Sequence, residues 1–297
     1  MTTKTATSDL SGKETTQPNW LQRVGLFTIF LVCGFAIFVF GSNYFEIFST
    51  NKNLTYNLII SAFFLVVALL LKRDKHRNRY RRIAYAFFIA SIAFPVTLLI
   101  SRWSDVVLGW FNVTVETSQG IAIAKMYEMI LVVIPILLLT KLSGADLGSI
   151  YLKRGNWKLS LGIGTLLFFN FAISALMFFA ERYTSADVLG AAIVWGLVFS
   201  FANGFMEELW LRGIFLKHFE PVLGISGSVL LTSIVFASMH AGAVYLTPAA
   251  IPFLLAYALT LGIGCGYLMM KTDNIWGATL IHAAADLFAF IAMLANA

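Results

Sequence analysis

The chain has 297 residues, of which 59% are hydrophobic and 12% charged, and its mean hydropathy is +0.81. This balance excludes a soluble globular protein. The formal net charge of +6 is concentrated in short stretches between apolar segments, which argues against nucleic acid as a partner and indicates a membrane protein. The two cysteines, Cys33 and Cys265, both lie in apolar segments, so the sequence predicts no disulfide framework.

The chain begins with a polar segment that is rich in threonine. Residues 1–19 contain no periodic apolar pattern, and we expect them to form a disordered tail. No short apolar region with a cleavage site follows, so the first apolar segment is expected to be an anchor rather than a removed signal peptide.

Apolar segments close to the ~20 residues needed to cross a bilayer then recur along the chain. Backbone groups in lipid must find partners within their own segment, so these spans are predicted to be helices. We predict an all-α fold, a polytopic bundle of about nine transmembrane helices (with eight as the alternative) around a polar cavity inside the membrane. The predicted spans cover residues 20–45, 54–71, 83–101, 121–140, 159–180, 188–210, 223–240, 249–270 and 276–294.

Basic residues between the spans predict the topology. The densest basic run, residues 72–82, separates the second and third spans and is typical of a short cytoplasmic loop. With this loop inside, the N-terminus is cytoplasmic and the C-terminus lies on the opposite side. The prediction is a multi-pass integral membrane protein, in the plasma membrane if the source is bacterial.

The chain divides by its polar content. Residues 20–149 hold four spans with little polar content, and we interpret them as accessory helices. Residues 150–297 hold five spans, three of which carry clusters of polar residues. In the eighth span, Gly262 and Gly266 form a small-residue pair that allows two helices to approach closely.

The first polar cluster lies at the end of the sixth span. Glu208 and Arg212 are four residues apart with the acid first, the favourable order for an ion pair on a helix. Glu207 points about 100° away from Glu208 and shares its helix face with Asn203. The alternative is a charge cluster at the membrane surface. Apolar residues continue beyond the cluster, however, which indicates that it is embedded in the membrane. An embedded carboxylate without a partner suits a general base.

The other two clusters each contain a histidine. Phe236 precedes His240 by one helical turn, and a lone histidine of this kind is more often a core residue than a catalyst. His282 precedes Asp286 by one turn, so the carboxylate could orient the imidazole, or the pair could join two helices by a hydrogen bond. Together, however, ionisable groups on three successive motif-bearing spans predict one shared site.

These motifs resemble a known family. Glu-Glu-x-x-x-Arg, Phe-x-x-x-His and His-x-x-x-Asp on successive membrane helices are similar to those of the CAAX-protease and bacteriocin-processing (CPBP) family, which includes the Ras-converting type of prenyl endopeptidase. The resemblance covers about residues 150–297. It implies a helical bundle around a cavity open to the cytosol. It also implies peptide-bond hydrolysis, which in prenyl-processing members removes the last three residues after a prenylated cysteine.

The resemblance also implies roles for individual residues. Glu207 corresponds to the general base that activates water, and His240 to its partner in holding that water. His282 and Asp286 correspond to the pair that stabilises the oxyanion. Glu208 and Arg212 would support them, together with Phe236 and Asn203. At position 286 many members have asparagine, and an ionised aspartate cannot donate to an oxyanion, so Asp286 could instead orient His282.

The residues leave three functions open. The first is an intramembrane endopeptidase acting on a hydrophobic or lipidated peptide, possessing the catalytic set Glu207, His240, His282 and Asp286. Glu207, His240 and His282 could also bind Zn²⁺ with water as the fourth ligand. The second is a proton-coupled transporter, although no internal repeat supports it. The third is a non-catalytic scaffold or immunity-type protein. Expected partners are a peptide or protein substrate and membrane lipids.

Overall fold

The computed structural model describes residues 18–42, 44, 47–72, 77–242 and 251–295. Within these ranges the chain is helical and contains no strand. The predicted tail falls largely outside them, but its last residue, Asn19, forms a capping box with Gln22 at the start of the first helix. The long helices are α1 (Trp20–Gly34), α2 (Thr50–Leu71), α3 (Asn78–Ile100), α5 (Ser118–Leu142), α6 (Trp157–Phe179), α7 (Ala186–Glu208), α8 (Leu216–Met239), α9 (Ile251–Thr272) and α10 (Trp276–Leu294).

Short helical turns extend several of these helices. Two are π-helical turns, η1 (Phe35–Val39) and η7 (Leu209–Gly213). Four are 3₁₀ turns, namely η4 (Ser101–Trp103), η5 (Leu147–Ile150), η6 (Ala180–Arg182) and η8 (His240–Gly242). The short helix α4 (Ser104–Trp110) follows η4. With these extensions, nine helices in the described ranges are long and apolar enough to cross a membrane. The predicted fold class and the predicted count of nine spans are therefore confirmed.

The boundaries of most spans differ from the predicted ones by a few residues, as the first, third and seventh spans show. The first span ends at Val39, not at residue 45, because its helix closes in a π turn. The third begins at Asn78, so the last part of the predicted basic loop is the first turn of α3. The seventh begins at Leu216, because a short helical segment precedes a break at Gly224, whose φ of 73° suits glycine.

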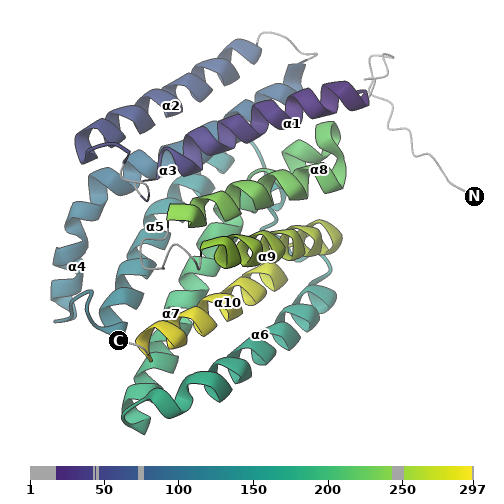
Figure 1. The fold of residues 1–297 in the computed structure, drawn as a ribbon. Helices are drawn as coiled ribbons and strands as arrows, with labels where there is room; N and C mark the ends of the chain where they lie inside the picture. The colour runs from purple at the N-terminus through teal and green to yellow at the C-terminus, as the bar shows by residue number, and fades with distance from the viewer. Residues whose placement is uncertain (1–17, 43, 45–46, 73–76, 243–250, 296–297) are drawn as a thin grey trace, which may run out of the picture.

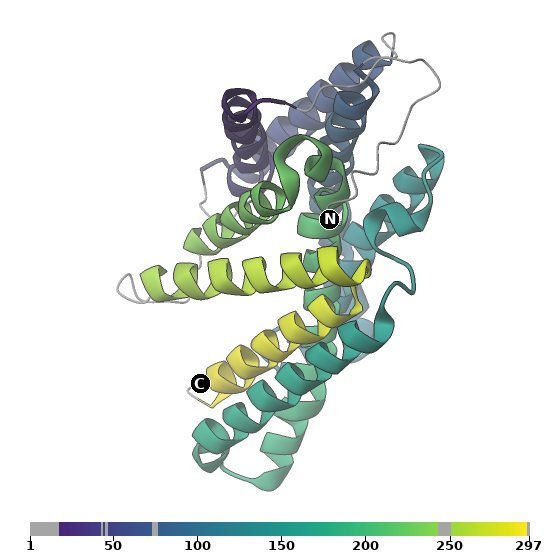
Figure 2. The same ribbon diagram turned by 90° about the vertical axis from the view of Figure 1, so that its right-hand side faces the viewer.

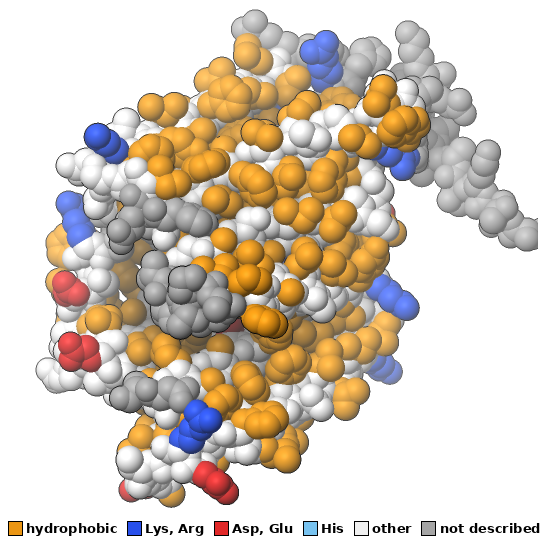
Figure 3. Space-filling model, viewed as in Figure 1, with side chains coloured by type: hydrophobic (Ala, Val, Ile, Leu, Met, Phe, Trp, Pro, Cys, Tyr) orange, Lys and Arg blue, Asp and Glu red, His pale blue; other side chains and the backbone are white. Residues whose placement is uncertain are grey.

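The helices form a bundle in which the C-terminal half is stacked in order. Figure 1 shows α8, α9, α10 and α6 lying side by side, with α7 and α5 behind them, and Figure 2 shows the same succession from the side. Helices α2 and α3 pack on one another, and α1 lies against α8. The space-filling view has a broad hydrophobic face with charged side chains towards its edges, as expected for a surface in lipid (Figure 3).

Basic residues gather at one end of the bundle, which we call the basic face. Here α5 and α9 end and α6 and α10 begin, and the connectors are tied together. Lys217 Nζ lies 2.6 Å from Asp273 Oδ1 and donates to the carbonyl of Gly148, and Lys153 also pairs with Asp273. Partial burial raises the pKa of Asp273, but the hydrogen bonds and charges of the two lysines outweigh it, so the net shift is downward.

The start of α10 is fixed to α6 by a polar contact. Asn274 Oδ1 accepts hydrogen bonds from Ser160 Oγ at 2.6 Å and from the Trp276 amide at 3.1 Å. Ser160 Oγ in turn accepts from the Gly277 amide at 2.8 Å. These bonds set the axial position of α10, and therefore the depth of the residues that follow on it.

The glycine pair of α9 brings α8 and α9 together, as predicted. A Cβ atom at Gly262 would lie 2.7 Å from Arg212 Nη2 and 3.0 Å from Ser233 Cβ, while one at Gly266 would lie 3.0 Å from a methyl group of Val229. Both glycines therefore permit an approach that a side chain would prevent. By contrast, Gly264 faces away and has nothing within 4 Å of a Cβ.

This difference predicts the effect of adding a side chain to α9. Gly262→Val should destabilise the fold by about 1–3 kcal/mol, because the new methyl groups must displace Arg212 and Ser233. Gly264→Val is the matched control on the same helix and should leave the melting temperature of the detergent-purified protein unchanged. Equal melting temperatures for the two variants would contradict the packing of α8 on α9.

Candidate functional site

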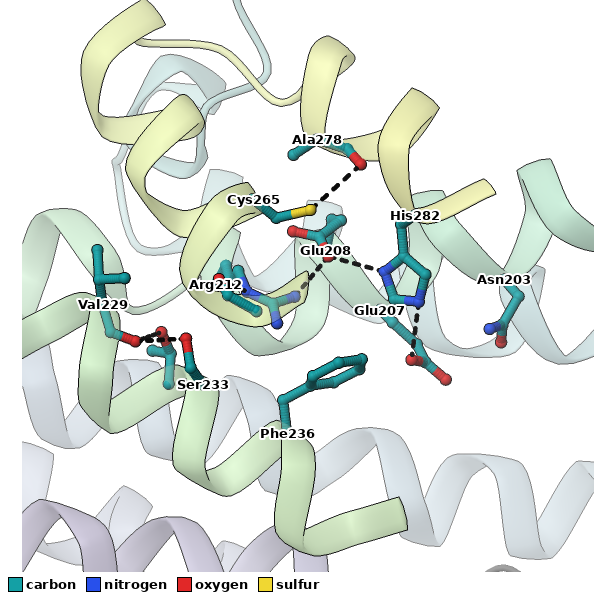
Figure 4. A network of polar contacts seen from close by, with 12 residues as sticks. Asn203, Glu207, Glu208, Arg212, Val229, Ser233, Phe236, Cys265, Ala278 and His282 are labelled. Atoms are coloured by element: carbon teal, nitrogen blue, oxygen red, sulfur yellow. Dashed lines mark hydrogen bonds and ion pairs between the residues drawn. The ribbon is translucent and has the colours of Figure 1, made fainter. Parts of the chain in front are cut away.

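The candidate site is built around a carboxylate that is completely buried. Glu208 is 0% exposed and lies at the junction of α7 and η7. Its Oε1 accepts a hydrogen bond from Arg212 Nη1 at 2.5 Å and another from His282 Nδ1 at 2.7 Å (Figure 4). The ion pair expected on one helix is thus formed, and the same oxygen also holds a histidine that is 74 residues away in sequence.

Arg212 is buried as completely as its partner. It is 0% exposed, its Nε donates to the carbonyl of Gly262 at 3.3 Å, and its guanidinium lies 4.5 Å from the ring centre of Phe236. An aromatic face attracts a desolvated cation, so Phe236 adds to the stabilisation that Glu208 provides. A buried charge is tolerated only with partners of this kind, and here they come from three helices.

A turn of π-helix sets the positions of Glu208 and Arg212. In η7 the Ile214 amide donates to the carbonyl of Leu209 at 3.1 Å, a spacing of five residues. Insertions of this kind occur often at functional sites. Trp210 anchors the turn, because its Nε1 donates to the carbonyl of Ala90 on α3 at 2.8 Å. The π turn is therefore fixed from both sides of the bundle.

His282 has one ring nitrogen committed and one available. A carboxylate can only accept, so the Nδ1 that faces Glu208 carries a proton. Its Nε2 faces Glu207 Oε2 at 3.6 Å and Asp286 Oδ1 at 3.8 Å, both too long for direct hydrogen bonds. The buried carboxylate of Glu208 thus orients the imidazole so that its Nε2 points towards Glu207, as outer partners orient catalytic histidines.

The sequence had suggested Asp286 as the carboxylate that orients His282. In the structure, Glu208 makes the hydrogen bond to His282, and Asp286 makes one to Asn203. Asp286 Oδ2 accepts from Asn203 Nδ2 at 3.0 Å, which joins α10 to α7 beside the histidine. Asn203 and Glu207 each keep one buried oxygen without a hydrogen-bond partner among the described residues, namely Oδ1 and Oε2. Glu207 Oε2 and Asp286 Oδ1 both lie within 4 Å of His282 Nε2.

His240 contributes from the end of α8. Its Nδ1 lies 2.9 Å from the carbonyl of Phe236, so this nitrogen is the donor and Nε2 is left available. The Phe236 ring packs edge-on against both imidazoles, with centroid distances of 4.6 Å to His240 and 5.4 Å to His282. Within the described ranges, His240 forms no ion pair with Glu207, in contrast to His282.

One ion pair reaches the site from an accessory helix. Lys125 Nζ lies 2.6 Å from Glu128 Oε2 on α5 and 5.8 Å from the ring centre of Phe199, one helical turn before Asn203. Its charge interacts with those of Glu207 and Asp286. The interpretation that residues 20–149 have little polar content missed this pair. Charged residues in the middle of an apolar span were the signal that could have found it.

The residues expected to bind zinc do not form a metal-binding cluster. Across the part of the chain that the structure describes, no three His, Cys, Asp or Glu side chains lie close enough to hold a metal ion. Glu207 lies near His282, while His240 is directed towards the backbone of its own helix. The arrangement of donors therefore does not fit the expected set of Glu207, His240 and His282.

The buried pair predicts how the site responds to loss of a charge. Glu208→Gln should destabilise the protein by about 3–5 kcal/mol, because Arg212 would keep its buried charge without a counter-ion. Glu220→Gln, which changes an exposed carboxylate on the next helix, is the matched control and should be neutral. Thermal unfolding in detergent measures both, and a neutral Glu208→Gln would show that Arg212 does not depend on this carboxylate.

Comparison with known proteins relates part of the chain to one family. Residues 189–288 match the model of a family described as type II CAAX prenyl endopeptidase Rce1-like. No curated protein and no solved structure matches the chain. The matched stretch holds every member of the polar cluster except Lys125 and Glu128, and its family, with the nine apolar helices, supports a multi-pass integral membrane protein. The match covers about a third of the chain, and it supports membership of the CAAX-protease (CPBP) family.

Proposed function

We propose that the protein is an intramembrane endopeptidase that hydrolyses a peptide bond in a hydrophobic or lipidated peptide, with a prenylated CAAX peptide as the substrate class that its family implies. One observation carries the proposal. Glu207, His282 and Asp286 converge within the bundle, while Glu208, paired with Arg212, holds His282 in place. Membrane proteins keep such groups away from lipid and use them at functional sites.

The proposed reaction begins with Glu207. Its Oε2, which has no hydrogen-bond partner among the described residues, accepts a proton from a water molecule, whose oxygen attacks the carbonyl carbon of the scissile bond. The carbonyl oxygen becomes an oxyanion in the tetrahedral intermediate. Glu207 then returns the proton to the amide nitrogen, which leaves as an amine when the C–N bond breaks. His240 helps to hold the water through its available Nε2.

His282 is proposed to stabilise the oxyanion. Its Nδ1 is held by Glu208, so its Nε2 is fixed in direction and, when protonated, donates to the developing negative charge. Asp286 carries its acceptor oxygens next to the same nitrogen and is fixed by Asn203. We therefore assign Asp286 to supporting the imidazolium form of His282, not to donating to the oxyanion.

Lys125 and Glu128 complete the electrostatics of the proposed site. Glu207 and Asp286 bring two carboxylates into an apolar region, where like charges repel strongly. The positive charge of Lys125 interacts favourably with both. The proposed steps need the side chains alone, because the donor arrangement does not fit a metal ion.

The proposal predicts separate effects for the two neighbouring glutamates. Glu207→Gln should lower the rate of peptide hydrolysis by about 10²-fold or more, because an amide cannot accept the proton from water. It should fold normally, since Oε2 has no hydrogen-bond partner among the described residues. Purified protein and a quenched lipidated peptide provide the assay, with Glu220→Gln as the control. Full activity in Glu207→Gln would remove the catalytic assignment and favour a scaffold or carrier.

We also propose that the basic face lies in the cytoplasm and that the C-terminus lies on the other side. Lys141, Lys153, Arg154 and Lys158 all lie at this face, as the positive-inside rule requires. Topology reporters fused after residue 78 and after residue 295 should report opposite sides of the membrane. Two reporters on the same side of the membrane would contradict an odd number of spans between these two positions.

A further inference from the structure

A second feature of the bundle lies outside the candidate site. A groove with a volume of about 940 Å³ runs between α5, α6, α7 and α10. Its lining is apolar apart from Arg154 and Thr279, and it is open at the side of the bundle. An apolar groove of this size in a membrane must be filled by hydrocarbon, because water there would gain no hydrogen bonds.

The groove changes character along its length. Arg154, Trp157 and Trp276 lie at its rim on the basic face, where α6 and α10 begin. Its other end is lined by Met126, which lies about 24 Å from the basic end of α5 at 1.5 Å per residue. A cationic, aromatic rim followed by a long apolar channel has the same order of polarity as a phospholipid in the leaflet at that face.

The rim offers one uncommitted positive charge. Lys153 is paired with Asp273, whereas the neighbouring Arg154 forms no ion pair with a carboxylate in the described part of the chain. The Arg154 guanidinium instead stacks 5.6 Å above the Trp157 ring, which holds it at the mouth of the groove. A guanidinium is well suited to bind a phosphate with two parallel hydrogen bonds.

The groove and the candidate site lie on different sides of α7. Phe201 and Phe205 line the groove, while Asn203 and Glu207 face the site. Each pair is four residues apart and therefore shares a face, and the two faces differ by about 200° around the helix. The groove therefore lies on the side of α7 that is opposite to Asn203 and Glu207.

We propose that this groove is a binding site for an anionic glycerophospholipid. The phosphate binds Arg154 at the rim, and the acyl chains lie along α5 and α7. Basic pockets between membrane helices on the cytoplasmic side bind anionic head groups in this way. The bound lipid supports the face of α7 that is opposite to Glu207 and so stabilises the position of the site. The proposal does not depend on the proposed protease activity.

The test measures lipid binding to the delipidated, detergent-purified full chain by native mass spectrometry. Phosphatidylglycerol and phosphatidylcholine with identical chains are titrated separately. We expect the wild type to bind phosphatidylglycerol about tenfold more tightly. Arg154→Gln should bind both lipids with the same weaker affinity. Both lipids carry the phosphate, so they differ only in the net charge of the head group, and Arg154 is the residue that responds to this charge. Val198→Trp, which fills the groove, should weaken the binding of both lipids alike.

The chain provides a matched control. Arg102 stacks 6.0 Å over the ring of Trp103 near the opposite face of the membrane, where it lines no part of this groove. Arg102→Gln should therefore keep the full preference for phosphatidylglycerol. Equal affinities of the wild type for the two lipids, or an unchanged preference in Arg154→Gln, would overturn the proposal. Displacement of phosphatidylglycerol by a prenylated peptide would assign the groove to that peptide instead and would also overturn it.

Discussion

The arrangement of the C-terminal helices depends on one carboxylate, that of Glu208. A single oxygen of this side chain accepts from Arg212 and from His282, so it links η7 to α10. None of the three residues is more than 1% exposed. Removing such charges from water costs several kcal/mol each, and the pairing of the charges offsets part of that cost. The helices must therefore meet in one register, because a displacement would leave a buried charge without a partner.

The constraint extends to the helix that carries no ionisable group of the site. Arg212 donates to the backbone of α9 at Gly262, and no side chain could occupy that position without displacing the guanidinium. Phe236 from α8 covers the guanidinium and contacts both imidazoles. The glycine of α9 and the aromatic ring of α8 are therefore part of the same arrangement as the ion pair. This explains why small and aromatic residues accompany the charged motifs.

Local patterns predicted a large part of this structure, and contacts between distant residues account for what they missed. Hydropathy predicted the nine spans, and a spacing of four residues predicted the pair of Glu208 with Arg212. The hydrogen bond from His282 to Glu208 joins residues 74 positions apart. The spacing of four residues between His282 and Asp286 had instead suggested Asp286 as the partner of His282. Spacing on one helix cannot show which helices become neighbours, and it gives no sign of the π turn that places Arg212. The contribution of Lys125 was missed for the same reason, since α5 precedes the motif-bearing helices by two spans.

Helix α7 shows how one segment can serve two environments. Its face with Asn203 and Glu207 is held by polar contacts to α10, and its opposite face with Phe201 and Phe205 borders the apolar groove. The polar contacts are directional, whereas the apolar residues that line the groove along α7 make no directional contact. Gly204 lies between these faces and packs against the backbone of α10, where a Cβ would meet the Ala283 nitrogen at 3.0 Å. The position of Glu207 relative to His282 therefore depends on the close contact at Gly204, and under the proposed lipid binding it also depends on the occupant of the groove behind α7.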